Sequence, residues 1–157
     1  CAQCHGSNAM GGQGFPNLTD NDWLYGGSPE AIKTTLLQGR QGNMPAFGEQ
    51  FSDKQITELA NYVASLSGRD RDPDLVEAGK ANFAVCSACH GADGKGNQQL
   101  GAPNLTDNVW LYGGSINKIE ETLKHGRNGV MPAWKDILGE DKIHVISAYV
   151  YSLSDDE

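Results

Sequence analysis

The residues best suited to chemistry in this chain form two copies of one pentapeptide. Each copy has a cysteine pair followed at once by a histidine, at positions 1–5 and 86–90. This spacing attaches a c-type haem, because two thiols add across the vinyl groups of one porphyrin and the next residue places an imidazole beneath the iron. The two motifs use all the cysteines of the chain: Cys1, Cys4, Cys86 and Cys89. They therefore predict two covalently attached haem c groups, with His5 and His90 as iron ligands.

Closely spaced cysteines also permit other chemistry. Two disulfides, a zinc site and a thioredoxin-like redox pair are the alternatives. Haem attachment accounts for a histidine directly after both pairs, and none of these alternatives does. At Cys1 a lipidated N-terminus is a further alternative, although the same cysteine completes a haem motif.

Two methionines are the candidates for the second iron ligand. Met44 and Met131 occupy matching places in Gly-Arg-x-Gly-x-Met-Pro-Ala followed by an aromatic residue. Each follows the histidine of its own half far enough along the chain to fold back over the opposite haem face, and the next proline stiffens its loop. The alternative is a core methionine that fills a gap. Met10 matches Lys95 in the second copy and is predicted to lie in a loop.

Two other histidines compete as ligands. His125 and His144 match Gln38 and Thr57 in the first copy, so the two copies would have to ligate iron differently. His125 is expected in the last turn of a helix, where a cation suits the helix dipole. We expect His144 to be a surface or packing residue.

Further recurring residues are candidates for contacts with the cofactor. Arg40 and Arg127 precede the methionines and could make charge-assisted bonds to haem propionates; the alternative is a solvated arginine. Four aromatic residues are expected at the haem rim, or else as plain core residues. They are Trp23, Tyr25, Trp110 and Tyr112.

Two prolines have a specific predicted role. A metal-bound histidine usually donates its other ring N–H to a carbonyl, which fixes the ring and raises its basicity. The carbonyl groups of Pro16 and Pro103 are well placed along the sequence to accept that bond from His5 and His90.

The chain repeats itself over almost its whole length. Pro-Asn-Leu-Thr-Asp at 16–20 returns at 103–107, and Trp-Leu-Tyr-Gly-Gly at 23–27 returns at 110–114. A charged stretch that ends in proline, 69–73, indicates a linker. We therefore predict two domains, residues 1–68 and residues 74–157.

The coarse pattern is helical, and we predict an all-α fold. Ser28, a following proline and an acidic residue start one helix, which Gly39 ends. Ser52 begins a capping box for another. The segment 75–89 is predicted to be a single helix, and no segment shows a convincing strand pattern. Long glycine-rich loops lie between the helices, and haem is the group that such loops would wrap.

Composition narrows the class of partner. The net charge of -8 excludes nucleic acid as a partner. No stretch approaches the ~20 apolar residues of a membrane span. Because residue 1 is already a haem cysteine, we expect the numbering to begin inside a longer precursor with an export signal or membrane anchor. Covalent haem attachment indicates an extracytoplasmic, usually periplasmic, location.

These motifs resemble the class I cytochrome c fold, which implies two tandem domains that each wrap one haem. The repeated Trp-Leu-Tyr-Gly-Gly and Gly-Arg-Asn-Gly-Val-Met-Pro-Ala elements are similar to the dihaem subunit III of cbb3-type cytochrome c oxidases. That resemblance covers nearly the whole chain and implies His5, Met44, His90 and Met131 as axial ligands. This sequence departs from the family pattern at its start, where the family's membrane anchor and first haem helix would lie.

The resemblance also implies a role. Such a subunit hangs from the periplasmic face of the bacterial inner membrane, accepts electrons from donor cytochromes c and passes them to the monohaem and catalytic subunits of the oxidase. The motifs equally allow a free dihaem carrier or the cytochrome subunit of a periplasmic dehydrogenase. A dihaem peroxidase-like enzyme would need an open iron position and an acid/base pair, and no duplicated pair is evident near the methionines.

Overall fold

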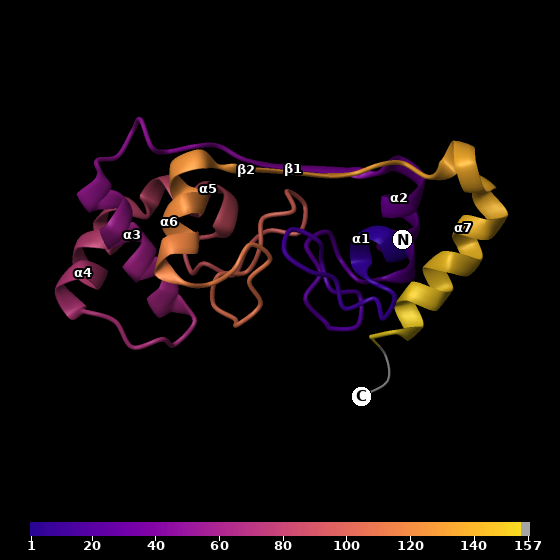
Figure 1. Cartoon of the computed structure of the whole chain (residues 1–157), viewed down its shortest axis with the longest axis horizontal. Helices are drawn as coiled ribbons and strands as arrows, with labels where there is room; N and C mark the ends of the chain where they lie inside the picture. Colours follow the sequence, from indigo (N-terminus) through magenta and orange to yellow (C-terminus); the bar gives the residue numbers. More distant parts are fainter. Residues whose placement is uncertain (155–157) are drawn as a thin grey trace. The chain divides into compact units, whose positions relative to one another are not determined.

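The computed structural model describes residues 1–154, which are mostly helical with one two-stranded sheet (Figure 1). The sheet corrects the all-α expectation. The elements, in chain order, are α1 (Ala2–His5), α2 (Pro29–Gln38), β1 (Arg40–Met44), α3 (Asp53–Leu66), α4 (Pro73–Asn82), α5 (Ala84–His90), α6 (Ile116–His125), β2 (Arg127–Met131) and α7 (Lys135–Ser152). Among these elements, no helix is long and apolar enough to cross a membrane.

The two strands are the repeated segments that carry the candidate methionines. β1 pairs with β2, its equivalent in the other copy, and the two lie side by side (Figure 1). The sequence did not predict them because each strand is short and contains a glycine, Gly42 or Gly129, which weakens strand propensity. Their pairing depends on a distant segment rather than on local preference.

Local signals placed two helices correctly. The Ser28 hydroxyl accepts a hydrogen bond from the Ala31 N–H at 3.2 Å, and α2 ends at Gly39, whose φ is 71°. At the start of α3, Ser52 and Gln55 form the predicted reciprocal capping box. These boundaries follow from short-range hydrogen bonds, which explains why the sequence revealed them.

The segment 75–89, predicted as one helix, is instead divided between α4 and α5. At the break, the Phe83 N–H bonds to the Lys80 carbonyl and the Cys86 N–H to the Phe83 carbonyl. Both bonds span three residues rather than four, so the backbone tightens there. The Phe83 side chain is buried at this point, 4% exposed. The expectation of a continuous helix was therefore wrong.

The chain forms two compact units that differ from its two sequence halves. Unit 2 is residues 43–128, and unit 1 combines residues 1–42 with the chain from Gly129 onward. Each unit thus contains segments of both repeats. The stretch 69–73 lies within unit 2, and the domain division at that stretch stays a prediction. The last three residues of the predicted second domain lie outside the described residues.

Unit 2 has the larger core. Its centre is the apolar face of α3, against which residues of α4, α5 and α6 pack. The Tyr62 and Phe83 rings meet edge to face, with centroids 5.1 Å apart. α4 crosses α3 closely at Gly79, where an added Cβ would lie 2.8 Å from the Tyr62 Cβ. Only glycine allows so close a crossing.

Unit 1 has a smaller core between α2 and α7, built on Ile32, Leu36 and Ile143. One side of α7 is covered by this cluster. On another side, Val145 is 67% exposed and Tyr149 is 62% exposed. The last helix of the chain therefore buries only part of its surface within unit 1.

Candidate functional site

The two motif histidines are held in the same way. His5 ends α1 and His90 ends α5, and both are buried. Nδ1 of His5 lies 2.9 Å from the carbonyl oxygen of Pro16, and Nδ1 of His90 lies 3.0 Å from that of Pro103. The hydrogen bonds expected from the sequence are thus present in both copies.

These bonds fix the protonation pattern of each ring. Because a carbonyl oxygen can only accept, Nδ1 of His5 and of His90 carries the proton and donates it. In the neutral ring this tautomer leaves the lone pair on Nε2, which is the form in which an imidazole binds a metal. A carbonyl acceptor behind the ring also restricts its rotation and raises its basicity as a ligand. These bonds thus prepare both histidines as metal ligands.

The four cysteines, all among the described residues, are free thiols. Cys1, Cys4 and Cys89 are exposed, whereas Cys86 is buried. Burial, with a smaller contribution from nearby Cys89, raises the pKa of the Cys86 thiol to about 11. Within residues 1–154 no group of three or more histidine, cysteine, aspartate or glutamate side chains could hold a metal ion.

The candidate methionines are partly buried and lie in different units. Met44 packs against the unit 2 core cluster that includes Cys86, and Met131 packs against the unit 1 cluster of α2 and α7. The structure therefore places Met44 in the same unit as His90, and Met131 in the same unit as His5. The histidine of each methionine's own repeat thus belongs to the other unit.

Arg40 and Tyr25 form a stacked pair in unit 1. The Arg40 guanidinium carbon lies 4.7 Å from the centre of the Tyr25 ring, and Nε donates to the Thr35 hydroxyl at 2.9 Å. No carboxylate pairs with Arg40 among the described residues. Its positive charge thus remains available to an anionic group.

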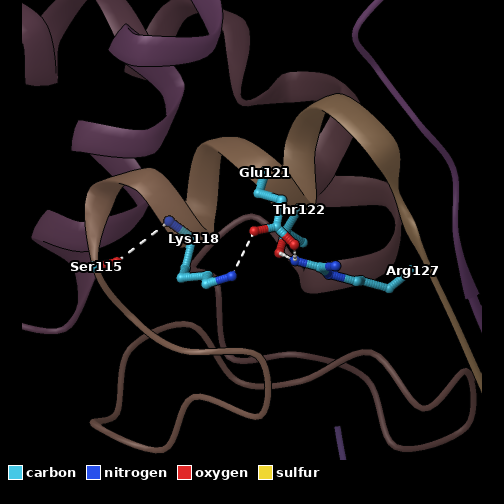
Figure 2. A network of polar contacts seen from close by, with 5 residues as sticks. All are labelled: Ser115, Lys118, Glu121, Thr122 and Arg127. Carbon is cyan, nitrogen blue, oxygen red and sulfur yellow. Dashed lines mark hydrogen bonds and ion pairs between the residues drawn. The ribbon is translucent and has the colours of Figure 1, made fainter. Parts of the chain in front are cut away.

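Arg127 and Tyr112 repeat this stack in unit 2, at 4.6 Å. Here Arg127 also bonds to Glu121 at 3.0 Å and to the Thr122 hydroxyl, and Lys118 reaches the same carboxylate (Figure 2). Hydrogen bonds from Lys118, then Arg127, hold the pKa of Glu121 below its usual range. Sequence reasoning missed the two threonines, although Thr35 and Thr122 recur at equivalent positions.

Trp110 has a partner that the sequence did not suggest. Arg69, from the stretch predicted as a linker, lies with its guanidinium carbon 5.0 Å from the Trp110 ring and donates to the Gly114 carbonyl. Trp110 packs against the core of unit 2, and Trp23 packs against that of unit 1. The one sequence signal for the stacking of Arg69 on Trp110 is the high proportion of charged residues in the stretch 69–73.

Two of the predicted rim residues have buried polar atoms without a partner. The Tyr25 hydroxyl and the Trp110 Nε1–H make no hydrogen bond within the described structure. A buried polar group without a partner costs roughly 1–3 kcal/mol. A haem has propionates that could accept from such donors, so these atoms, the free thiols and the prepared histidines all fit a covalently bound haem.

The remaining candidates lie where the sequence suggested. His125 is in the last turn of α6, directly before Gly126, and is exposed. His144 is exposed on α7, and Met10 is 59% exposed in a loop. None of the three packs against either core cluster.

A mostly helical chain with two Cys-x-x-Cys-His motifs has the features of the c-type cytochromes. The family model described as cytochrome c oxidase, cbb3-type, subunit III matches residues 1–63 and 74–150. The chain belongs to that family, which confirms the resemblance seen in the sequence.

Named relatives agree with this assignment. Over 98% of the chain, it is 48% identical to the cbb3-type cytochrome c oxidase subunit CcoP of Rubrivivax gelatinosus. Over its whole length it is 46% identical to the subunit FixP of Sinorhizobium medicae and 44% identical to the subunit CcoP of Cereibacter sphaeroides. The chain spans 51% of the first relative and 58% of the other two.

Proposed function

We propose that this chain is the dihaem electron relay of a cbb3-type cytochrome c oxidase. It takes electrons from donor cytochromes c and passes them to the monohaem and catalytic subunits. It does so at the periplasmic face of the bacterial inner membrane, where a membrane anchor outside this chain holds it. Family membership and the printed names of the relatives support this role.

The observation that carries the proposal is the repeated histidine bond. Each unit contains one Cys-x-x-Cys-His motif whose histidine donates from Nδ1 to a proline carbonyl. We infer that each unit wraps one haem c, attached at Cys1 and Cys4 in one case and at Cys86 and Cys89 in the other. A bound haem supplies an iron that gains and loses single electrons.

The protein's own residues would keep that iron closed to other ligands. His5, His90, Met44 and Met131 would hold the two irons. Histidine with methionine raises the reduction potential relative to other ligand sets and leaves no position open for catalysis. Arg40 and the Tyr25 hydroxyl would bind propionates in unit 1, and the Trp110 N–H would do so in unit 2. Such a site favours electron transfer over chemistry on a substrate.

The test is a haem count by intact mass, together with spectra of the reduced protein with and without carbon monoxide. We expect two covalent haems and no spectral shift, because both irons are six-coordinate. The Met131→His variant should lower the potential of one haem by roughly 0.2 V and leave the other in place. A carbon monoxide shift in the unmodified protein, or an unchanged potential in the variant, would contradict the proposed ligands.

A further inference from the structure

The two arginine–tyrosine stacks differ in the charged residues around them. In unit 2, Glu121 lies on α6 directly before Thr122, the threonine whose hydroxyl accepts from Arg127. The equivalent residue of Glu121 in unit 1 is Thr34, which is uncharged. The arginine, the tyrosine and the threonine of the stack thus recur, whereas a carboxylate occupies this position in unit 2 and not in unit 1.

Glu121 binds Arg127 through one terminal nitrogen of the guanidinium, Nη2. This nitrogen lies 3.0 Å from Oε1 of Glu121 and also donates to the Thr122 hydroxyl at 2.8 Å, while Nε donates to the same hydroxyl (Figure 2). Both hydrogens of Nη2 and the hydrogen of Nε are therefore engaged. A further anion would meet Arg127 at Nη1, and the carboxylate beside it would offset its charge.

Lys118 holds the same carboxylate by its other oxygen. Its ammonium group donates to Oε2 of Glu121 at 2.7 Å, and Ala31 stands at the equivalent position in unit 1. Each oxygen of Glu121 thus has its own cation, which restricts the side chain and favours its ionised form. The pKa of Glu121 is lowered accordingly, so this group is a carboxylate at neutral pH.

Arg40 in unit 1 is not offset in this way. It stacks on Tyr25 and donates from Nε to Thr35, and no carboxylate pairs with it among the described residues. The Tyr25 hydroxyl of the same stack is buried and makes no hydrogen bond within residues 1–154. A haem propionate would therefore meet an unopposed guanidinium in unit 1 and an opposed one at the equivalent place in unit 2.

We propose that Glu121 withholds Arg127 from the propionates and thereby lowers the reduction potential of the haem attached in unit 2. This inference rests on the haem attachment proposed above and adds a residue that tunes one of the two haems. Oxidised haem iron carries one more positive charge than reduced iron, so a nearby carboxylate stabilises the oxidised form. Occupation of Arg127 acts in the same direction, because it removes a cation that would otherwise offset the propionates.

A redox titration of the two-haem protein, followed by visible spectra and proton NMR, measures the two potentials. NMR assigns them, because cross-relaxation connects each porphyrin through its thioether bridges to the attached cysteines. In Glu121→Gln, whose amide retains the shape of the side chain, we expect the potential of the haem on Cys86 and Cys89 to rise. The reduction equilibrium constant of that haem should increase about threefold, as for a partly screened charge interaction. This increase corresponds to roughly 30 mV.

Two further variants should lower a potential instead. Lys118→Gln removes the cation that shares the carboxylate, so more of the negative charge acts at Arg127 and the potential of the unit 2 haem should fall. Thr34→Glu places a carboxylate at the equivalent position of unit 1, within reach of Arg40, and should lower the potential of the unit 1 haem. A merely loosened structure would not move one potential up in Glu121→Gln and down in Lys118→Gln.

Glu77→Gln is the matched control for the change in net charge. Glu77 is an exposed residue of α4 that enters none of the ion pairs within residues 1–154. Water screens such an exposed charge, so this variant should leave both potentials in place.

The outcomes separate this tuning from the function. Unchanged potentials in Glu121→Gln and in Thr34→Glu, or a shift that Glu77→Gln reproduces, would overturn the inference and leave the two-haem relay standing. If one of the first two variants does not accumulate, the other decides. If the intact mass of the unmodified protein showed fewer than two covalent haems, the relay itself would be refuted, and the tuning with it.

Discussion

α3 in unit 2 and α7 in unit 1 are equivalent helices of the two repeats, yet their surroundings differ. Glu58 on α3 is 8% exposed because α4 crosses this face, whereas Val145 at the equivalent position of α7 is 67% exposed. The charged side chain of Glu58 is thus covered, whereas the apolar side chain of Val145 is open to solvent. Burial at these positions is thus set by the neighbouring element rather than by side-chain hydrophobicity.

The tyrosines of the two helices show the same contrast. Tyr62 on α3 packs edge to face on Phe83, and Tyr149 on α7 is 62% exposed. A repeated sequence therefore does not guarantee repeated energetics. Substitutions in α3 and its partner α4 should cost more than equivalent changes in α7.

The largest expected effect is at the crossing of α4 over α3. Gly79→Ala should destabilise the haem-loaded protein by about 3 kcal/mol, because the new Cβ would meet the Glu58 carbonyl oxygen. In an uncrowded helix the same change stabilises by roughly 1 kcal/mol, so the sign is diagnostic. Denaturant unfolding measures it.

Gly12→Ala is the control for this substitution, because nothing lies within 4 Å of its added Cβ. That variant should unfold close to the unmodified protein. A Gly79→Ala protein as stable as the original would show that α4 does not cross α3 at this glycine.

The next effect compares the two tyrosines. Tyr62→Ala should cost about 2 kcal/mol, since it removes the ring that packs on Phe83. Tyr149→Ala should change stability by less than about 0.5 kcal/mol, as expected for an exposed position. Thermal unfolding of the two variants side by side measures the difference, and equal losses would remove the contrast between α3 and α7.

The smallest effect concerns pH. A hydrogen bond from Lys124 lowers the pKa of Asp53, so this carboxylate stabilises unit 2 above its unfolded pKa and loses that contribution as pH falls through its lower folded pKa. In the Asp53→Asn variant, the free energy of unfolding should fall less steeply as the pH is lowered. Denaturant unfolding at neutral and acidic pH measures this effect. If the free energy of unfolding of the variant depended on pH as steeply as that of the unmodified protein, the Asp53–Lys124 pair would not stabilise unit 2.

Glu140 on α7, the equivalent of Asp53, provides the comparison. Its pKa is also lowered, chiefly by a hydrogen bond from Lys135, which precedes the kink of α7 at the non-helical Gly139. That pair does not join α7 to α2. Only a weaker charge interaction with Lys33 links Glu140 to α2, so Glu140→Gln should loosen the contact between these two helices less than Asp53→Asn loosens that between α3 and α6.

Much of the local structure could be predicted from the sequence. The caps at Ser28 and Ser52 and the proline carbonyls behind His5 and His90 depend on residues near one another in the chain. The cofactor-binding motif could be identified because its chemistry demands a fixed spacing. These features need no knowledge of tertiary structure.

The pairing of the repeats could not be predicted in the same way. Leu36 and Leu123 are equivalent residues, as are Trp134 and Phe47, so a contact within a repeat and one between repeats look alike in the sequence. The strands were missed for the same reason, because within residues 1–154 each strand pairs with its distant copy. Duplication makes the choice of partner a question of chain connection and packing rather than local preference.

The burial of Cys86 has a consequence for how the protein matures. Its thiol lies inside the packed helices of unit 2, while the other three thiols face solvent. A thiol must meet a vinyl group to form a thioether, and a buried, protonated thiol is a poor nucleophile. In the proposed attachment of haem at Cys86, the thioether would therefore form before the helices of unit 2 close around this residue.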